Sequence, residues 1–322
     1  MVKRLWLAIG GVLLLAPAIA HCQGYPSKPI RIIVAFAPSG NIDITARIIA
    51  PGLAEILGQP VVVENRGGAG GRIGSTLVAK SPPDGYTVLL GASGTLAAQP
   101  VFHDDIEYQP LRDFVFTSLI SIVPSVLSVH PSLPVRSVKE LIALAKARPE
   151  TLLMASAGQG SATHLMGELF QSMAKVKFVH VPYKGSGAAV IDLVGGQAHL
   201  SFDQVSSAGP FIKVGRLRAL AVTSIQRSKF LPDVPTIDES GLRGYDSSTY
   251  TTLAIPIATP KEAVQKLRDA VDTVVAQPRT REAFEKLGAE TFRSTPDDFT
   301  RRLQQDTARW ARIRKETGLK ID

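Results

Sequence analysis

Apolar and polar positions alternate along the chain in the manner of strands followed by helices. Residues 30–36 are almost entirely apolar, as expected of a strand buried on both faces. In residues 43–57 the apolar side chains fall on one stripe of a helix. Strand signals follow at 60–63 and 86–90, with a helix signal at 72–80 between them. This βαβαβ order predicts a parallel sheet with right-handed crossovers.

A second half of the same kind follows after a change of pattern. The serine-rich apolar segment 114–129 predicts two consecutive strands, with Pro124 in its middle. A capping box from Ser137 to Glu140 then opens a helix. The later signals are strands at 151–156, 178–181, 199–202 and 217–223 and helices at 161–174 and 186–194. Strand and helix therefore alternate here as they do at the start.

The last third returns to one more strand and two capped helices. Residues 250–255 predict the strand, and Thr259-Pro260 and Thr295-Pro296 each supply an N-cap followed by proline at the first helical position. We expect an α/β protein of two doubly wound lobes, joined by a hinge of two crossing segments near 124–130 and 245–256. A cleft between such lobes is where a ligand would close them.

The expected organisation assigns every part of the chain. Residues 1–24 form a signal peptide and short leader, residues 25–125 and 250–322 form the first lobe, and residues 126–249 form the second. Lys3 and Arg4 precede an uncharged apolar run that is shorter than the roughly 20 residues of a spanning helix. An uncleaved membrane anchor and a lipid anchor on Cys22 are the alternatives.

Composition narrows the class of protein. The chain has 322 residues, of which 45% are hydrophobic and 20% charged, as in a packed globular protein. Its single Cys excludes an internal disulfide framework. Lys and Arg number 36 against 28 Asp and Glu, and removal of Lys3 and Arg4 leaves 34 against 28, or +6. No basic stripe is interleaved with aromatics, so we expect an anionic small molecule and no nucleic acid.

The common enzyme motifs are missing. The chain has no Gly-Lys dipeptide for a phosphate loop, and residues 67–72 lack the third glycine of a dinucleotide fingerprint. The segment 91–95 ends in threonine where a nucleophile elbow has glycine. His164 and Glu168 lie one helical turn apart but have no third partner for a metal. We therefore expect no catalytic residue, no metal and no cofactor.

Three strand-to-helix turns rich in Gly, Ser, Thr and Asn stand in place of these motifs. Such turns leave backbone N–H groups free at a helix N-terminus, where the peptide dipoles favour negative charge. The candidates are Ser39, Gly40, Asn41 and Asp43 in the first turn, Ser93, Gly94 and Thr95 in the second, and Ser156, Gln159, Ser161, Thr163 and His164 in the third. For any one of these turns alone, tight turning and helix capping explain the Gly and Ser residues better than ligand binding does. Together, we expect them to converge on one gap between the lobes.

Two further strand ends supply the candidates Tyr183 and Asp203. Tyr183 could equally cover the edge of the core, and Lys184 beside it could be a solvated charge. Asp43 is ambiguous as well. It either accepts hydrogen bonds from helix amides or meets a ligand ammonium, and it would repel a bare carboxylate.

These stretches together resemble the Bug receptors, the TctC-like extracytoplasmic solute receptors of tripartite tricarboxylate transporters. The likeness is carried, in order, by residues 25–30, 36–43, 58–65, 67–71, 83–86, 155–164, 181–185, 202–203 and 231–236. It implies a periplasmic, monomeric protein with a fold like the type II periplasmic binding proteins. It also implies capture of a small organic anion by backbone amides and waters, and membrane transporter subunits as partners. The anion would be a di- or tricarboxylate, an acidic amino acid or an aromatic acid.

The resemblance carries ligand contacts over to Ser39, Asn41, Asp43, Ser93, Thr95, Ser156, Gln159, Ser161 and Asp203. The chain departs from the family at Ser39, where glycine is usual, and at Gln204 and Ser206, where Asn and Pro are commoner. We therefore expect Ser39→Gly to change ligand preference more than fold stability. The alternatives are a secreted enzyme acting on a carboxylate, with His164 or Asp203 as base, and a non-transport sensor partner.

Overall fold

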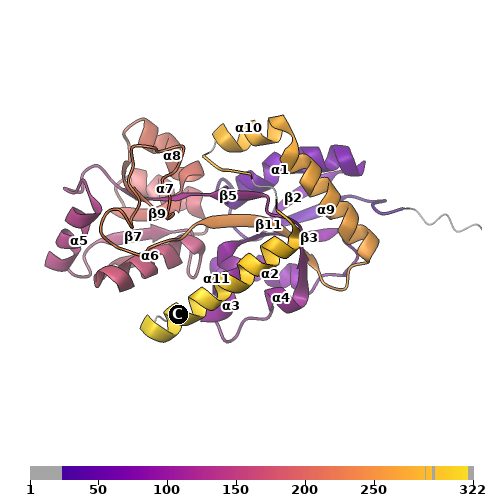
Figure 1. Cartoon of the computed structure of the whole chain (residues 1–322), viewed down its shortest axis with the longest axis horizontal. Helices are drawn as coiled ribbons and strands as arrows, with labels where there is room; N and C mark the ends of the chain where they lie inside the picture. The colour runs from indigo at the N-terminus through magenta and orange to yellow at the C-terminus, as the bar shows by residue number, and fades with distance from the viewer. Residues whose placement is uncertain (1–23, 287, 292–293, 318–322) are drawn as a thin grey trace, which may run out of the picture.

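Two β-sheets organise the computed structural model, which describes residues 24–286, 288–291 and 294–317 (Figure 1). The first sheet has the order β2-β1-β3-β11-β4, and β5 also pairs with β11. Its strands are β1 (Ile30–Val34), β2 (Val61–Asn65), β3 (Thr87–Ala92), β4 (Phe114–Phe116), β5 (Ser121–Val123) and β11 (Thr249–Pro256). Strand β1 is parallel to β2 and β3, whereas β11 runs antiparallel to β3, β4 and β5. The parallel βαβαβ start is confirmed.

The second sheet has the order β10-β6-β9-β7-β8. Its strands are β6 (Ser125–Val129), β7 (Leu153–Ser156), β8 (Val179–Pro182), β9 (Leu200–Gln204) and β10 (Arg218–Val222). Strand β7 is parallel to β8 and β9, and β6 is antiparallel to β9 and β10. The segment 114–129, predicted as two strands, forms three, because β5 stays in the first sheet and β6 begins the second.

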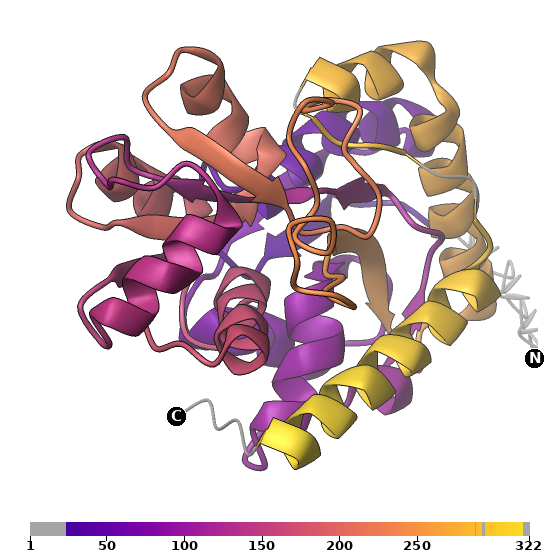
Figure 2. The same cartoon turned by 60° about the vertical axis from the view of Figure 1, so that its left-hand side comes forward.

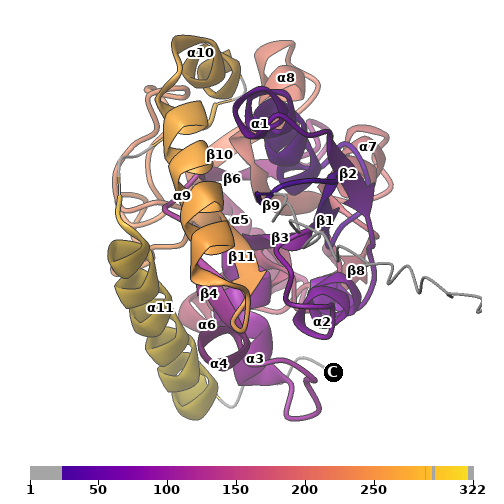
Figure 3. The same ribbon diagram turned by 90° about the vertical axis from the view of Figure 1, so that its right-hand side faces the viewer.

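Helices cover both sheets (Figure 3). Around the first sheet lie α1 (Asn41–Leu57), α2 (Arg72–Ala79), α3 (Gln99–Phe102), α4 (Pro110–Asp113), α9 (Lys261–Ala276), α10 (Pro278–Lys286) and α11 (Pro296–Thr317), with the short turns η1 (Ala69–Gly71) and η2 (Gly94–Ala98, a π-helix). The second sheet has α5 (Val138–Ala147), α6 (Ala162–Ala174), α7 (Ser186–Val194) and α8 (Val205–Lys213). The sequence pattern missed α3, α4, α8 and α10, which are short or carry proline in or beside the helix.

Burial explains why the two sheets form. All five residues of β6 and of β9 and all eight of β11 are buried. The edge strands β2 and β8 are half exposed. Strands covered on both faces read as continuous apolar runs, and the hydrophobic effect stabilises them most. The core therefore follows the centres of both sheets.

The fold is α/β with two lobes, as the sequence predicts (Figure 2). The chain passes from the first sheet to the second at Pro124, between β5 and β6. It returns through residues 223–248, between β10 and β11. Helix α11 then runs back along the first lobe, where Trp310 packs against Phe102 of α3 with ring centroids 6.1 Å apart. Strand ends and helix starts of both lobes consequently face each other.

Within the described part of the chain, no helix combines the length and the apolarity that a membrane crossing needs. The expected signal peptide and the alternative of an anchor at Cys22 fall on residues outside the described part of the chain.

Candidate ligand-binding cleft

A small cavity of about 30 Å³ lies between the lobes. By volume it has room for one or two water molecules. Its lining consists of Phe36, Gly40, Asn41, Ile42, Ala92, Gly94 and Thr249 from the first lobe, and Ala157, Ser161, Ala162, Thr163, Ser186 and Gln204 from the second. None of these lining residues carries a charged side chain. Any negative charge placed here must therefore be stabilised by dipoles.

Three helices begin at this cavity. Helix α1 starts at Asn41, α6 at Ala162 and α7 at Ser186. The first N–H groups of a helix have no partner inside it, and the helix dipole makes this end positive. The N-caps of α1 and α7 are Gly40 and Gly185, neither of which supplies a side-chain cap. Amide donors at two helix starts are thus left for another acceptor.

Asn41 adds a side-chain donor to these amides. The residue is 3% exposed, and its Oδ1 accepts a hydrogen bond from Ser206 Oγ of the second lobe at 3.3 Å. Its Nδ2 is buried and has no hydrogen-bond partner among the described residues. An unsatisfied buried donor costs about 1–3 kcal/mol. A carboxylate oxygen in the cavity would remove that cost.

Asp43 supports the start of α1 and does not line the cavity. Its carboxylate accepts hydrogen bonds from the Ser39 amide at 3.0 Å, from Arg47 Nε at 3.0 Å and from Asn65 Nδ2 at 2.9 Å. Burial acts to raise the pKa of Asp43, but the bonds from Arg47, Ser39 and Asn65 outweigh it and hold the pKa below its usual value. Of the two roles open to Asp43, the structure shows the internal one. A ligand ammonium is not needed to balance its charge.

Ser39 is exposed, outside the cavity lining, and has a left-handed backbone with φ of 70°. Its side chain therefore does not narrow the cavity. This geometry argues against the expectation that Ser39→Gly changes ligand preference. The usual glycine of the family is explained instead by the backbone, because glycine adopts positive φ without a Cβ penalty.

Behind the start of α6 lies a pair of histidines, of which His164 is buried and His180 is half-buried. The rings of His164 and His180 stack with centroids 3.7 Å apart and planes within 6°. His164 Nδ1 accepts from the Gly160 amide at 3.0 Å, and its Nε2 lies 3.4 Å from Glu168. His180 Nε2 and Ser156 Oγ are 2.6 Å apart. Burial, and then His164, lower the pKa of His180 to about 3, against the opposing effect of Glu168.

This arrangement makes His164 and Ser156 supports of the loop 156–161 and not members of the cavity lining. The described residues contain no cluster of three or more His, Cys, Asp or Glu that could hold a metal. Nor is His164 arranged as a general base, because its Nδ1 already accepts a backbone hydrogen bond.

Asp203 is fully buried beside the cavity. The Gln204 amide donates to its Oδ1 at 2.7 Å, and its Oδ2 has no hydrogen-bond partner in the described part of the chain. Burial raises the pKa of Asp203 to about 7, against the opposing effect of that amide. Near neutral pH a large fraction of Asp203 is therefore uncharged, so it repels a neighbouring carboxylate less than an ionised aspartate would.

The structure thus brings together five of the predicted site residues as cavity lining: Gly40, Asn41, Gly94, Ser161 and Thr163. A Cβ added to Gly94 would lie 2.7 Å from the Ala162 nitrogen, so the predicted convergence of the three turns is present. The other predicted residues lie outside this lining: Ser39, Asp43, Ser93, Thr95, Ser156, Gln159, His164, Tyr183 and Asp203. Ligand contact by these residues stays a prediction.

Several of these outer residues have internal partners. Thr95 Oγ1 bonds to backbone atoms of Ala92, and the Thr95 carbonyl accepts from Tyr108. The hydroxyl of Tyr183 interacts with Asp192, and burial together with that carboxylate raises the pKa of Tyr183 to about 12. Such bonds fix the shape of the turns.

Sequence reasoning missed several lining residues. Gln204 donates to Thr249 Oγ1 at 3.0 Å across the lobes and accepts from Ser186 Oγ at 3.1 Å. A signal for Ser186 was present, since it follows the glycine that precedes a predicted helix. Thr249 had no such signal, because its place depends on β11 crossing to the first sheet.

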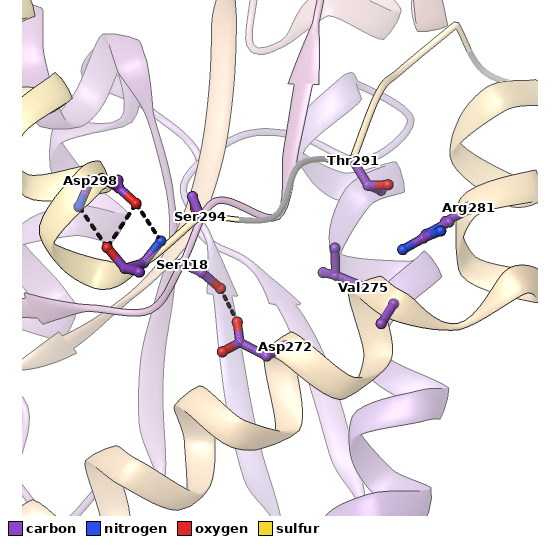
Figure 4. A pocket seen from close by; sticks show the side chains of 9 residues that line it. Ser118, Asp272, Val275, Arg281, Thr291, Ser294 and Asp298 are labelled. Atoms are coloured by element: carbon purple, nitrogen blue, oxygen red, sulfur yellow. Dashed lines mark hydrogen bonds between the residues drawn. The ribbon is translucent and has the colours of Figure 1, made fainter.

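A larger pocket of about 400 Å³ lies within the first lobe, between α9, α10 and the start of α11 (Figure 4). Asp272 accepts from Ser118, and Asp298 accepts from the Thr295 amide at 2.9 Å. Its lining has two carboxylates, Asp272 and Asp298, and one cation, Arg281, so its charged side chains sum to −1 and repel an anion overall. It also belongs to one lobe, so closure does not enclose it.

Two α/β lobes that meet over helix starts at an uncharged cavity define a two-lobed solute-binding protein. The family model described as "Tripartite tricarboxylate transporter family receptor" matches residues 45–319, and the chain belongs to this family. Its members are binding proteins, and the resemblance found in the sequence is confirmed.

Relatives match nearly the whole chain. Protein BugT of Bordetella pertussis is 38% identical over 319 residues, covering 98% of both chains. A protein from the tcbD–tcbE intergenic region of a Pseudomonas species is 40% identical over 292 residues, covering 90% of this chain and 87% of that one.

Solved structures agree with this placement. An R. palustris protein solved with adipate has 37% identity and a TM-score of 0.87, covering 91% of this chain and 98% of that one. MatC from Rhodopseudomonas palustris, with bound malate, has 32% identity and a TM-score of 0.87, covering 90% of this chain and 99% of that one.

Proposed function

We propose that this chain is a periplasmic receptor that closes around a small dicarboxylate and delivers it, unchanged, to the membrane subunits of a tripartite tricarboxylate transporter. The observation that carries the proposal is the meeting of the α1 and α7 starts, neither with a side-chain cap, with the unpartnered Asn41 Nδ2. Adipate and malate, bound by two neighbours, are both dicarboxylates.

The geometry suits an anion without a cationic side chain. One carboxylate group would take the place of the one or two waters for which the cavity has room and accept hydrogen bonds from the first amides of α1 and α7 and from Asn41. The rest of the acid requires the lobes to lie further apart than they do in this structure. Phe36, Ile42 and Ala162 keep the surroundings apolar. Dipoles that point at a charge act more strongly in such low-polarity surroundings. Closure of the lobes is therefore part of the binding site.

The proposal also covers the two lobes and the hinge between them. Residues 25–125 with 250–322 would form one lobe and residues 126–249 the other, hinged at Pro124 and in the connection to β11. The signal peptide within residues 1–24 would direct export and be removed, and the mature receptor would act as a monomer. We propose no catalysis, because His164 is held by the Gly160 amide and Glu168 within its own lobe.

Thermal unfolding with malate, adipate, citrate, glutamate and benzoate tests this function. We expect at least one dicarboxylate to stabilise the mature protein, by about 2.7 kcal/mol at a hundredfold excess over Kd. Mass spectrometry should recover the ligand unaltered. If none of these acids raises the Tm, or if the acid returns chemically changed, the receptor proposal is wrong.

Asn41→Asp is the sharpest variant for the same test. It keeps the shape of the side chain but replaces the free donor with a carboxylate, so binding should fall at least a hundredfold. Gln109→Glu, on the exposed surface of the same lobe, makes an equal change of charge away from the cavity and should bind like the wild type. Equal affinities of both variants would exclude Asn41 from the site.

A further inference from the structure

A glycine-rich turn of the first lobe touches the loop before α6 of the second lobe. Gln99, the first residue of α3, is 1% exposed and lies between them. Its Nε2 donates to the Gly70 carbonyl at 3.3 Å and to the Gln159 carbonyl at 3.2 Å. One side-chain amide therefore joins a backbone carbonyl of each lobe.

Glycine is required on both sides of this contact. A Cβ added to Gly70 would lie 1.9 Å from the Gln159 carbonyl oxygen, and one added to Gly160 would lie 2.4 Å from Gln99 Nε2. Both are well inside van der Waals contact, and both residues have positive φ, 61° at Gly70 and 65° at Gly160. The run of glycines at 67–71, which matches no nucleotide-binding motif, thereby acquires a physical role: it lets the two backbones meet.

The contact is coupled to the cavity through the chain. Gln159 lies two residues before Ser161, which is the N-cap of α6. The Ser161 Oγ accepts a hydrogen bond from the His164 amide at 3.3 Å. The start of α6 lines the cavity. Gly70, Gln99 and Gly160 lie outside that lining, so they act on closure without touching the ligand.

We infer that Gly70, Gln99, Gln159 and Gly160 form an interlobe latch that sets how much of the receptor is closed, and thereby scales its affinity for every ligand by one common factor. The inference rests on the proposed function, since closure matters only if the cleft captures a solute. When only the closed form binds tightly, the apparent Kd is the intrinsic Kd divided by the closed fraction. A latch variant should therefore change Kd without changing preference.

Gly70→Ala, compared with Gly58→Ala, tests the latch. Gly58 has a φ of 68° in the same lobe, and its added Cβ would meet no atom within 4 Å. Both variants incur the cost of alanine in a left-handed backbone, but only Gly70→Ala obstructs the other lobe. We expect similar losses of Tm, and a Kd for malate and adipate raised at least tenfold, by the same factor, in Gly70→Ala alone.

Gln99→Leu removes the hydrogen bonds without adding bulk to the backbone. Its matched control is Gln171→Leu, because buried Gln171 bonds to Glu168 and to the Phe178 amide, both within the second lobe. We expect Gln99→Leu to raise the Kd for malate and for adipate by a common factor of roughly three- to tenfold, mainly through faster dissociation. Gln171→Leu should lower stability and leave Kd unchanged.

A distance measurement separates the latch from the function. Spin labels at the exposed positions Ile191 and Ile257, one in each lobe, with Cys22→Ser, report the spread of interlobe distances in the ligand-free protein. Gly70→Ala should lengthen that distance relative to Gly58→Ala. Equal distances and equal Kd values would overturn the latch, and a factor that differs between malate and adipate would also overturn it. A wild type that binds no acid would overturn the function, while the distances would still decide the latch.

Discussion

The two lobes hold the helix starts at the cavity with different chemistry. In the first lobe, α1 is supported by an ionic cluster in which Asp43 bonds to Arg47, Asn65 and the Ser39 amide, and the Arg47 side chain is 54% exposed. In the second lobe, α6 is supported by the stack of the buried His164 on the half-buried His180. Both clusters hold a helix start in place. The Asp43 cluster is charged, whereas the His180 imidazole stays neutral at physiological pH.

The difference shows how the local environment of each cluster decides whether its side chains are charged or neutral. In the first lobe Asp43 is buried, and its charge is stabilised against desolvation by three hydrogen bonds, one of them from Arg47, whose side chain reaches solvent. In the second lobe partial burial disfavours a charged His180 ring, which is held by Ser156 and by stacking on His164. The stability that the Asp43 cluster supplies should therefore depend on the charge of Asp43. The stability that the histidine stack supplies should fall when His180 becomes protonated.

Asp43→Asn should give the largest effect. Removal of the charge that Arg47 and the Ser39 amide share should lower the free energy of unfolding by about 2–3 kcal/mol at pH 7. Since the pKa of Asp43 is lowered in the fold, this contribution exists above the unfolded pKa and is lost as the pH falls through the folded one. Urea unfolding measures it. Asp233→Asn, at an exposed site, is the control, and equal midpoints for the two variants would contradict the prediction.

A pH series should reveal the second support. The folded pKa of His180 is about 3, below the roughly 6.5 of an unfolded histidine, so protonation favours unfolding. The stabilisation is complete above pH 6.5 and is lost as the pH falls, by about 2 kcal/mol at pH 5. Glu168 and His164 face the same ring, and Asp203, with its pKa of about 7, changes stability in the opposite direction between pH 4 and 7.

The wild-type curve alone therefore hides the effect of His180. The informative quantity is the free energy of unfolding of the wild type minus that of His180→Gln, which should shrink by about 2 kcal/mol from pH 7 to pH 5. A constant difference for His180→Gln would mean that the stack carries no pH dependence.

Ser39→Gly should give the smallest effect, and a stabilising one. Relief of the left-handed backbone outweighs the added freedom of the unfolded chain, for a net gain of about 0.5–1 kcal/mol. The ratio of malate to adipate affinity should not change, because Ser39 lies outside the cavity lining. Calorimetry measures both quantities. A shift in that ratio would restore Ser39 as a specificity residue.

Much of the fold and part of the site could be predicted from local patterns. The apolar strands and the Ser161 N-cap follow from neighbouring residues, because burial and capping act over a few positions. The positions of Gly40 and Asn41 at the start of α1 follow in the same way. Helix α8 was missed because it contains Pro210, which opposes a helix prediction.

Other features depend on residues that are distant in the sequence. Nothing local indicates that Asn65 bonds to Asp43, 22 positions away, or that Gln99 reaches Gln159, 60 positions away. Thr249 joins the cavity only because β11 crosses back to the first sheet.

The amino-acid order by itself indicated most of the strands, the longer helices and the family, because apolar periodicity, capping and motifs depend on residues that are close together in the sequence. Only the tertiary structure decided which turns face one another, which polar groups are paired and which donor stays free. Those outcomes depend on distances between sheets and on exclusion of water, and both exist only once the lobes have packed.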